Sequence, residues 1–323
     1  MRQPCPVPWV LALAIMAAAP APAAETSRAE RVTLIPGAFP ADRAPDGNSV
    51  IFEGDHGLVV VDTGRHKEHQ AAILDRARAL GKPIVAIVNT HWHLDHSGGN
   101  QEIRAVYPHA KLYTSNAVRA SLDGFLASEL ANARKRLADP AMNEAARTET
   151  QLAVDAIEDR KDLLPDVPVT GPTRLPLGKG ALELHLARNA ATAGDIWLYD
   201  PATRTLVAGD LVVIPAPFFD TACAEGWRTA LSEIAKVRFV RLIPGHGPEL
   251  SRADFDLYRL AYDQLLDCAE GPAARQSCID GWQRDAAIFL HTAKDHRDVQ
   301  ELLDYYLDRI LRDRGRQAAF CAG

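Results

Sequence analysis

The sequence has no excess of basic residues. Its 36 Lys and Arg are outnumbered by 42 Asp and Glu, which gives a net charge of −6. Nucleic acid and anionic lipid are attracted by broad positive surfaces, so this composition argues against both as partners. The chain also lacks internal repeats, and beyond its N-terminus it has no apolar run long enough to cross a bilayer. These absences leave an ordinary globular composition, with 47% hydrophobic and 24% charged residues.

The N-terminus has the features of a secretory signal peptide. Arg2 gives a positive start, an apolar run extends from Trp9 to Ala19, and the small residues Ala21 and Ala23 suit a cleavage site. The apolar run is too short to span a bilayer comfortably, although an uncleaved anchor is the alternative interpretation. We therefore expect residues 1–23 to be removed and the mature protein to be periplasmic or secreted.

Cysteine is scarce, with five in the chain, and Cys5 falls in the expected signal peptide. An even number of cysteines in an exported chain suggests disulfides, and the remaining four allow three pairings. A turn at Gly271-Pro272 favours the pair Cys268 and Cys278, which would leave Cys223 with Cys321. Buried free thiols are the alternative. No cysteine lies at metal-ligand spacing from the histidines, so none is assigned a catalytic role.

Two β-rich stretches flank a helical one, which predicts a layered α/β architecture. Residues 116–163 between them are rich in Ala, Leu, Glu and Arg, and predict two or three amphipathic helices interrupted at Asp139-Pro140. From Ser251 onward the pattern is helical, with Ser251 as the N-cap. The expected strands are 49–52, 58–61, 83–88, 111–113, 182–186, 195–199, 205–207 and 239–243, and further helices are expected over 66–80, 100–106 and 227–237.

The strongest chemical signal is the segment His91-Trp92-His93-Leu94-Asp95-His96. Four metal-competent side chains follow directly after an apolar strand, where a loop can direct them inward from a rigid base. Packing alone does not explain this cluster, because such groups are costly to bury unpaired. Imidazole nitrogen and carboxylate oxygen suit zinc, although iron or manganese would also be compatible with these ligand types.

This segment resembles the His-x-His-x-Asp-His signature of the metallo-β-lactamase superfamily. Three further motifs follow the family's order: Val61-Asp62-Thr63-Gly64, Ala208-Gly209-Asp210 and Pro244-Gly245-His246-Gly247. The resemblance covers roughly residues 31 to 250 and implies an αββα sandwich with the metals at one edge between the sheets. It divides the chain into the signal peptide (1–23), a metallo-β-lactamase-like domain (24–250, with the helical insertion 116–163) and a C-terminal helical extension (251–323).

The resemblance also implies roles for the matching residues. Asp210 would bridge two metals and Asp62 would support the ligands from behind. Asp95 would also act in catalysis by orienting the nucleophile and carrying a proton. The implied ligands of one or two Zn²⁺ ions are His91, His93, Asp95, His96, Asp210 and His246.

One position departs from the family pattern. Members usually carry a histidine in a His-Thr-x-Gly-Asp turn, whereas this chain has Ala191 at the start of that turn. A methyl group cannot bind a metal, so the site formed by His91 and His93 lacks its usual third protein ligand. The neighbouring second site keeps Asp95, His96 and His246, with Asp210 as a further candidate ligand. Three interpretations are compatible with this. The protein could hold one ion in the second site, it could hold two ions with water or Asn189 completing the first site, or it could be a binding protein without activity. We expect retained metal with a weakened first site, and we expect His185 to lie too far along its strand to substitute.

The resemblance implies an exported zinc hydrolase in which a metal-activated water attacks a small-molecule substrate. Asp210 is similar to the glyoxalase II, lactonase and alkylsulfatase-like branches, which favours an ester, thioester or lactone substrate. A β-lactamase is the second hypothesis, and a non-catalytic metal-binding or redox-accessory protein is the third. Residues 212–221, with Phe218 and Phe219, would either wall the pocket or pack in the core. The helices of 116–163 would form a lid or a stabilising insertion, and the oligomeric state is not readable from the sequence.

Overall fold

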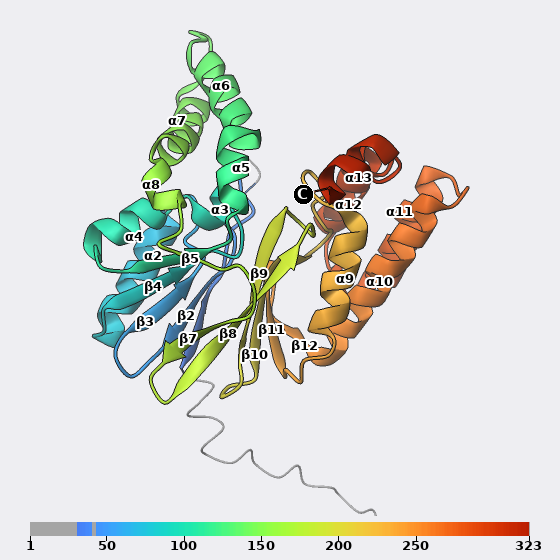
Figure 1. The fold of residues 1–323 in the computed structure, drawn as a ribbon. Helices are drawn as coiled ribbons and strands as arrows, with labels where there is room; N and C mark the ends of the chain where they lie inside the picture. The colour runs from blue at the N-terminus through green and yellow to red at the C-terminus, as the bar shows by residue number, and fades with distance from the viewer. Residues whose placement is uncertain (1–30, 41–42, 323) are drawn as a thin grey trace, which may run out of the picture.

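The computed structural model describes residues 31–40 and 43–322, and the expected signal peptide with Cys5 lies outside these residues. Two six-stranded sheets pack face to face in the centre of the molecule, with helices against both outer faces (Figure 1). No helix within the described ranges is long and apolar enough to span a membrane. The expected αββα sandwich is therefore confirmed.

The first sheet has the strand order β1-β2-β3-β4-β5-β6. Strands β1 to β3 pair antiparallel, and β3 to β6 pair parallel. The central strand β4 has the sequence IVAIV, an apolar run of the kind that parallel strands buried on both faces require. The strands are β1 (Val32–Ile35), β2 (Ser49–Glu53), β3 (Leu58–Val61), β4 (Ile84–Val88), β5 (Lys111–Thr114) and β6 (Val167–Pro168).

The second sheet has the order β12-β11-β10-β9-β8-β7, in which only the β10–β11 pair is parallel. Strand β10 is buried along its whole length and extends six residues beyond the expected strand 205–207, since it runs to Val213. The strands are β7 (Thr173–Leu177), β8 (Gly180–Arg188), β9 (Gly194–Asp200), β10 (Thr205–Val213), β11 (Arg241–His246) and β12 (Leu250–Ser251).

Three apolar layers hold the sandwich together. Side chains such as Val59 and Val88 of the first sheet and Leu184 and Ile196 of the second form the layer between the sheets. A second layer joins the first sheet to helices α2 (Lys67–Leu80) and α4 (Asn100–Val106). The third and most extensive layer joins the second sheet to α9 (Ala224–Ile234) and the C-terminal helices. Each fully buried Val, Leu or Ile contributes about 1.5–3 kcal/mol, so these layers fix the position of the strand ends.

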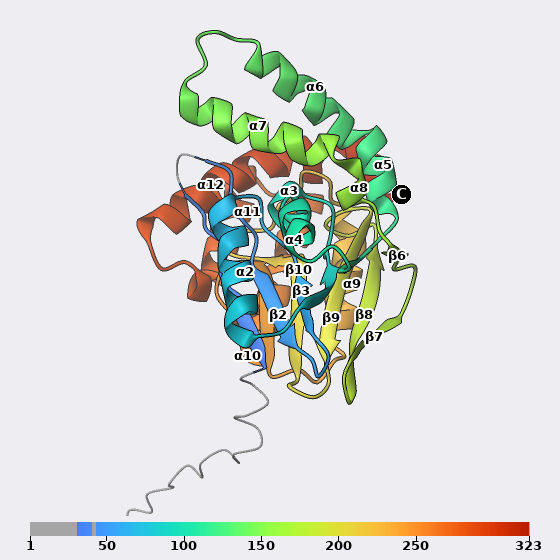
Figure 2. The same ribbon diagram turned by 90° about the vertical axis from the view of Figure 1, so that its left-hand side faces the viewer.

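The segment between β5 and β6 folds into four helices rather than the two or three predicted. They are α5 (Ala117–Asp123), α6 (Phe125–Leu137), α7 (Glu144–Glu158) and α8 (Arg160–Leu163). The expected interruption at Asp139-Pro140 lies between α6 and α7, which run side by side above the edge of the sandwich (Figure 2). Their apolar faces pack on Trp92 and Leu94, so the insertion rests directly on the histidine segment.

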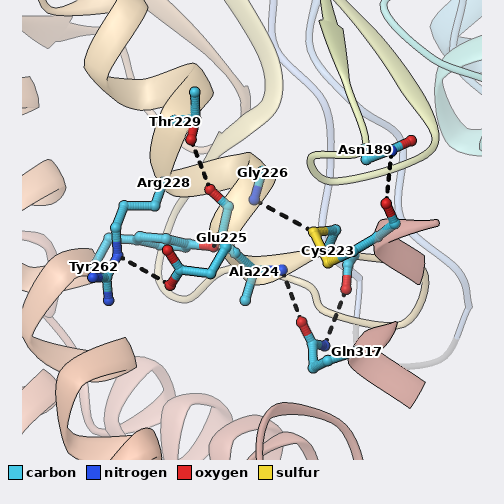
Figure 3. Close-up of a disulfide and its surroundings, with 11 residues drawn as sticks. Asn189, Cys223, Ala224, Glu225, Gly226, Arg228, Thr229, Tyr262 and Gln317 are labelled. Carbon is cyan, nitrogen blue, oxygen red and sulfur yellow. Dashed lines mark hydrogen bonds and ion pairs between the residues drawn. A yellow bond between two sulfur atoms is a disulfide. The ribbon is translucent and has the colours of Figure 1, made fainter. Parts of the chain in front are cut away.

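The chain after β12 is helical, as predicted. Helix α10 (Arg252–Glu270) is capped at its N-terminus by Ser251, whose side chain forms a capping box with Asp254. It is followed by α11 (Arg275–Asp285), α12 (Ala293–Tyr306) and α13 (Arg314–Cys321). Two disulfides secure this region: Cys268–Cys278 joins α10 to α11, as favoured from the sequence, and Cys223–Cys321 joins the start of α9 to α13 (Figure 3).

Candidate metal centre and its pocket

The candidate ligands come together at one edge of the sandwich, where three strands end. His91 to His96 follow β4 and include the short helix α3 (Leu94–Ser97), while Asp210 lies in β10 and His246 is the last residue of β11. Contacts between strands that are far apart in sequence therefore gather these side chains. All but His93 are buried, with Asp95 the most exposed of them at 9% and His96 fully enclosed.

The donor atoms are separated by distances that suit one ion. Nε2 of His246 lies 3.1 Å from Oδ2 of Asp95, and Nε2 of His96 lies 3.1 Å from Oδ1 of Asp210. The Nε2 atoms of His96 and His246 are 3.2 Å apart. Two atoms bound at 2.0–2.1 Å to a tetrahedral zinc lie about 3.3 Å apart, so these spacings match a zinc site.

The donors form two groups of three that share His96. One group is Asp95, His96 and His246, and the other is His91, His96 and Asp210, with all donor atoms of each group within 4.8 Å of one another. Nε2 of His91 is buried and has no hydrogen-bond partner among the described residues. A buried polar atom without a partner is rare in a folded protein, and a cation among these donors would satisfy it. The residues present therefore fit a zinc ion.

The electrostatics of the cluster favour a positive charge at its centre. Burial alone would lower the pKa of His96, but the carboxylates of Asp210, Asp95 and Asp62 outweigh burial and hold that pKa well above its usual value. Burial instead holds the pKa of the His91 imidazole well below its usual value, which leaves this ring neutral. Neutral imidazole is the form that ligates a metal.

Asp62 contacts the His96 ring on the side opposite to the other donors, and its support of a bound metal stays a prediction. Its Oδ2 accepts a hydrogen bond from Nδ1 of His96 at 2.8 Å, which directs Nε2 of that ring toward the other donors. The same carboxylate accepts the backbone N–H and the hydroxyl of Thr90, at 2.8 and 2.7 Å. Asp62 therefore ties the end of β3 to the start of the histidine segment.

Two glycines allow the backbone to approach the donors. A Cβ atom at Gly47 would lie 2.3 Å from Cε1 of His96, and one at Gly245 would lie 2.0 Å from Oδ1 of Asp210. Both distances are shorter than van der Waals contact, so a side chain at either position would displace a donor. Gly245, the first glycine of the Pro-Gly-His-Gly motif, is thus required by the close packing of the backbone against Asp210.

His93 is not part of either donor group. Its Nε2 lies 3.3 Å from the Thr221 hydroxyl, which donates its proton to the Ala191 carbonyl at 3.1 Å. Because this hydroxyl has one proton, it accepts the Nε2–H of His93, and Nδ1 of that ring is left unprotonated. Thr221 thus bridges Ala191 and His93, a role that no sequence motif indicates beyond its place in the 212–221 loop.

The proposed substitute ligands do not reach the centre. The Asn189 amide donates to the Cys321 carbonyl at 3.0 Å, which directs it toward the C-terminal helix (Figure 3). Asn189 as a completing ligand is therefore wrong in this structure. His185 stacks on Trp197 with ring centroids 3.9 Å apart, in agreement with the expected sheet-face role.

A cavity of about 580 Å³ lies over the donors and reaches Asp95 and Asp210. Phe218 lines it, whereas its neighbour Phe219 is fully buried in the core, so the two hypotheses for this loop each hold for one ring. Helices α6, α7 and α12 supply further walls, which places the insertion over the centre. Arg65, Phe39 and Tyr306 also line the cavity, although none of them belongs to a motif that predicts a site residue.

A family model described as "Metallo-beta-lactamase superfamily" matches residues 43–246. A hydroxyacylglutathione hydrolase from Synechococcus sp. (strain JA-3-3Ab) is 48% identical over 52 residues, which cover 16% of this chain and 21% of that protein. An (R)-specific secondary-alkylsulfatase from Pseudomonas sp. is 47% identical over 58 residues, covering 17% of this chain and 9% of that protein. The chain thus matches about a fifth or less of the length of these curated relatives.

Solved structures share the fold at low sequence identity. The sec-alkylsulfatase Pisa1 from Pseudomonas sp. has a TM-score of 0.53 at 20% identity, covering 83% of this chain and 49% of that one. The DIM-1 metallo-β-lactamase exposed to ceftazidime has a TM-score of 0.52 at 15% identity, covering 72% of this chain and 93% of that one. Since the family model spans more than half of the 323 residues and the fold agrees, the chain belongs to the metallo-β-lactamase superfamily.

Proposed function

We propose that this protein is an exported zinc-dependent hydrolase of small molecules that carry an ester, thioester, lactone or related bond. The observation that supports this most directly is the convergence of Asp95, His96, Asp210 and His246, two of which, Asp95 and Asp210, line a cavity. Family membership adds to it, because the named relatives of this chain include hydrolases.

Asp95, His96 and His246 would hold one zinc ion, and His91 with Asp210 would hold or share a second. When bound, zinc lowers the pKa of a coordinated water to near 7 and polarises the substrate oxygen. This second ion would occupy the first site, next to His91 and His93. It would be held weakly there, because Ala191 provides no donor and His93 is engaged by Thr221. We therefore propose that the principal ion lies among Asp95, His96 and His246.

The protein's own groups would position the reactants. Asp95 lies at the cavity floor and would orient the attacking water and accept its proton. As the water oxygen bonds to the substrate carbonyl carbon and the bond to the leaving group breaks, that proton passes to the leaving group. His93 also lines the cavity, and its unprotonated Nδ1 would be a second proton acceptor there. The rings of Phe39 and Phe218, both close to His246, would limit access of bulk water.

The experiment combines metal analysis with a substrate panel. Purified protein is assayed for zinc and tested on chromogenic lactone, thioester, ester, phosphodiester and β-lactam substrates, with and without chelator. We expect turnover that chelator and Asp95→Ala both abolish. Zinc bound without turnover of any class would instead indicate a non-catalytic metal-binding protein, and hydrolysis confined to the lactam would indicate a β-lactamase.

Ala191 provides a separate test of metal stoichiometry. Ala191→His restores the donor that the family usually carries, so bound zinc should rise toward two ions per chain by elemental analysis. The Ala191→Gln variant is the matched control, because it adds bulk without an imidazole. An unchanged zinc content in Ala191→His would count against a first site that is weakened by the missing histidine.

Export is proposed from the N-terminal pattern and is supported by two disulfides, Cys223–Cys321 and Cys268–Cys278, which are typical of proteins from oxidising compartments. Fractionation of cells that express the full chain tests this. Mature protein that begins near Ala24 in the periplasm or medium is the expected result, and full-length protein in the cytoplasm would contradict it.

A further inference from the structure

Arg65 lies between β3 and α2, next to the candidate metal centre. Its backbone N–H donates to Oδ1 of Asp46 at 2.6 Å, and the backbone N–H of His66 donates to the same oxygen at 2.9 Å. One buried carboxylate thus holds this stretch of backbone in place. Arg65 therefore projects from a fixed position, as a binding residue must if it is to select a ligand.

A chain of buried groups ties this position to the insertion. Nδ1 of His66 lies 2.8 Å from Oδ2 of Asp46, and Nε2 of His66 lies 2.9 Å from Oε2 of Glu149 on α7. Because each ring nitrogen faces a carboxylate oxygen, the protonated ring is favoured, and the pKa of His66 is raised, with the hydrogen bond to Asp46 as the largest cause. His66 thus makes the short contacts to both carboxylates, and Arg65 is the more distant cation beside Glu149.

The Arg65 guanidinium has little of its binding capacity used. The Nη1 atom lies 3.8 Å from Oε1 of Glu149, which is longer than a hydrogen bond. Its Nε is buried and has no hydrogen-bond partner among the described residues, and the same is true of that Glu149 oxygen. An arginine has five donors in a planar array, and among the described residues the Arg65 side chain, which lines the cavity, makes no hydrogen bond.

The other charges of the cavity are placed differently. Asp220 accepts the Tyr306 hydroxyl at 2.6 Å, and Asp95 and Asp210 belong to the metal centre. Glu129 and Arg136 lie on α6 in the outer wall, and Arg136 is exposed to solvent. Arg65 is thus the inner cation of the cavity.

The rest of the cavity wall is mainly apolar. The aromatic side chains of Trp92, Phe125 and Phe218 line it, together with Leu126 and Leu302. A pocket with apolar walls and a small number of placed polar groups typically binds a largely apolar ligand in a fixed orientation. In this cavity the polar groups nearest the metal centre are Asp95, Asp210 and Arg65.

We propose that the Arg65 guanidinium binds an anionic group of the substrate, so that the enzyme selects organic anions whose apolar body lies against the aromatic wall and whose negative group lies next to the bond that is cleaved. Guanidinium matches carboxylate, sulfonate and phosphate oxygens in paired hydrogen bonds. The inference rests on the proposed function, because the metal centre is what places the cleaved bond beside Arg65.

The first test measures binding without turnover. Calorimetric titration with 1-hexanesulfonate and with 1-hexanol compares a charged and a neutral ligand of the same chain length, on zinc-loaded and on chelator-treated protein. We expect the wild type to bind the sulfonate more tightly than the alcohol. Arg65→Gln should lower the affinity for the sulfonate by about 10- to 100-fold and leave the affinity for the alcohol unchanged. Arg65→Lys should retain part of the preference, and Arg136→Gln, at the exposed rim, should retain all of it.

The second test uses two esters with equal acyl chains, 4-nitrophenyl hydrogen glutarate and 4-nitrophenyl pentanoate. Arg65→Gln should lower kcat/KM for the anionic ester and leave the neutral one unchanged. An equal loss on both esters would assign Arg65 a structural role and overturn the proposal, as would tighter binding of hexanol than of hexanesulfonate by the wild type.

Failure of the proposed function would look different. In that case neither ester would be hydrolysed, while sulfonate binding that depends on Arg65 would persist. Thermal unfolding of each variant accompanies both tests. If Arg65→Gln does not fold, Arg65→Lys serves as the test variant. The affinity for hexanesulfonate relative to hexanol should then be lower than in the wild type. An equal ratio would contradict the need for a planar guanidinium.

Discussion

Replacing Asp62 by Asn should weaken metal binding while preserving the fold. Asp62 has a φ of 56°, a left-handed conformation that Asn tolerates better than most residues. The amide oxygen can still accept the Thr90 N–H, and the Thr90 hydroxyl can turn to accept from the amide. His96 loses its hydrogen bond to residue 62, because its Nδ1–H would then face an N–H of the amide.

The conflict has one simple resolution, which is a change of tautomer. If His96 accepts at Nδ1, its proton moves to Nε2, the atom directed at Asp95, Asp210 and His246. Zinc binding requires an unprotonated Nε2, which places the remaining proton on Nδ1 against the amide N–H, so the zinc complex of the variant lacks the hydrogen bond that the wild type has. Loss of one charge-assisted hydrogen bond corresponds to about 1.5–3 kcal/mol, which is about 10- to 100-fold in zinc affinity.

The assay is a zinc titration of metal-free protein in competition with a chromogenic chelator. Asp200→Asn is the matched control, because Asp200 is also buried and accepts two local hydrogen bonds, from Ala202 N–H and the Thr203 hydroxyl, but it takes no part in the metal centre. Nitrogen-15 NMR of the imidazoles reports the tautomer. A folded Asp62→Asn protein with wild-type zinc affinity, or an equal loss in Asp200→Asn, would refute this reasoning.

Two further predictions concern backbone space and pH. Gly245→Ala should lower zinc content, because its Cβ would lie 2.0 Å from Oδ1 of Asp210, whereas Gly171→Ala, with nothing within 4 Å, should not; equal zinc content in both variants would contradict the crowding argument. His66→Gln should lower the free energy of unfolding in urea most at about pH 6 and progressively less toward pH 9, since a raised folded pKa contributes stability below the unfolded pKa of about 6.5 that is lost as pH rises through the folded value. A difference that does not vary with pH would show that the charge of His66 is not what stabilises its contacts.

Local signals were sufficient for most of the secondary structure. The run IVAIV predicted β4, and Ser251 with Asp254 marked the start of α10, because both depend on neighbours in sequence. The short strand β1 and the strand β7 were not predicted. Each lies at the edge of its sheet and exposes part of its side chains, so neither has the apolar run that identifies a buried strand.

The candidate site was predicted only as far as its motifs reach. His91, Asp95, His96, Asp210 and His246 come together as the motif order implied. The pairing of Thr221 with His93 joins positions 128 residues apart, and that of His66 with Glu149 joins positions 83 apart. Such contacts depend on how the loops and the insertion pack, which neither periodicity nor composition encodes.

The Cys223–Cys321 disulfide has a practical consequence for anyone who prepares this protein. Cys223 lies two residues after Thr221, and its backbone N–H donates to the Ala190 carbonyl beside Ala191. With the cysteines reduced, the hydrogen bonds of Gln317 to Ala222 and Ala224 would be the nearest remaining link between α13 and this loop. A batch made in a reducing cytoplasm would lack this covalent link, so thiol titration should precede any comparison of zinc content between preparations.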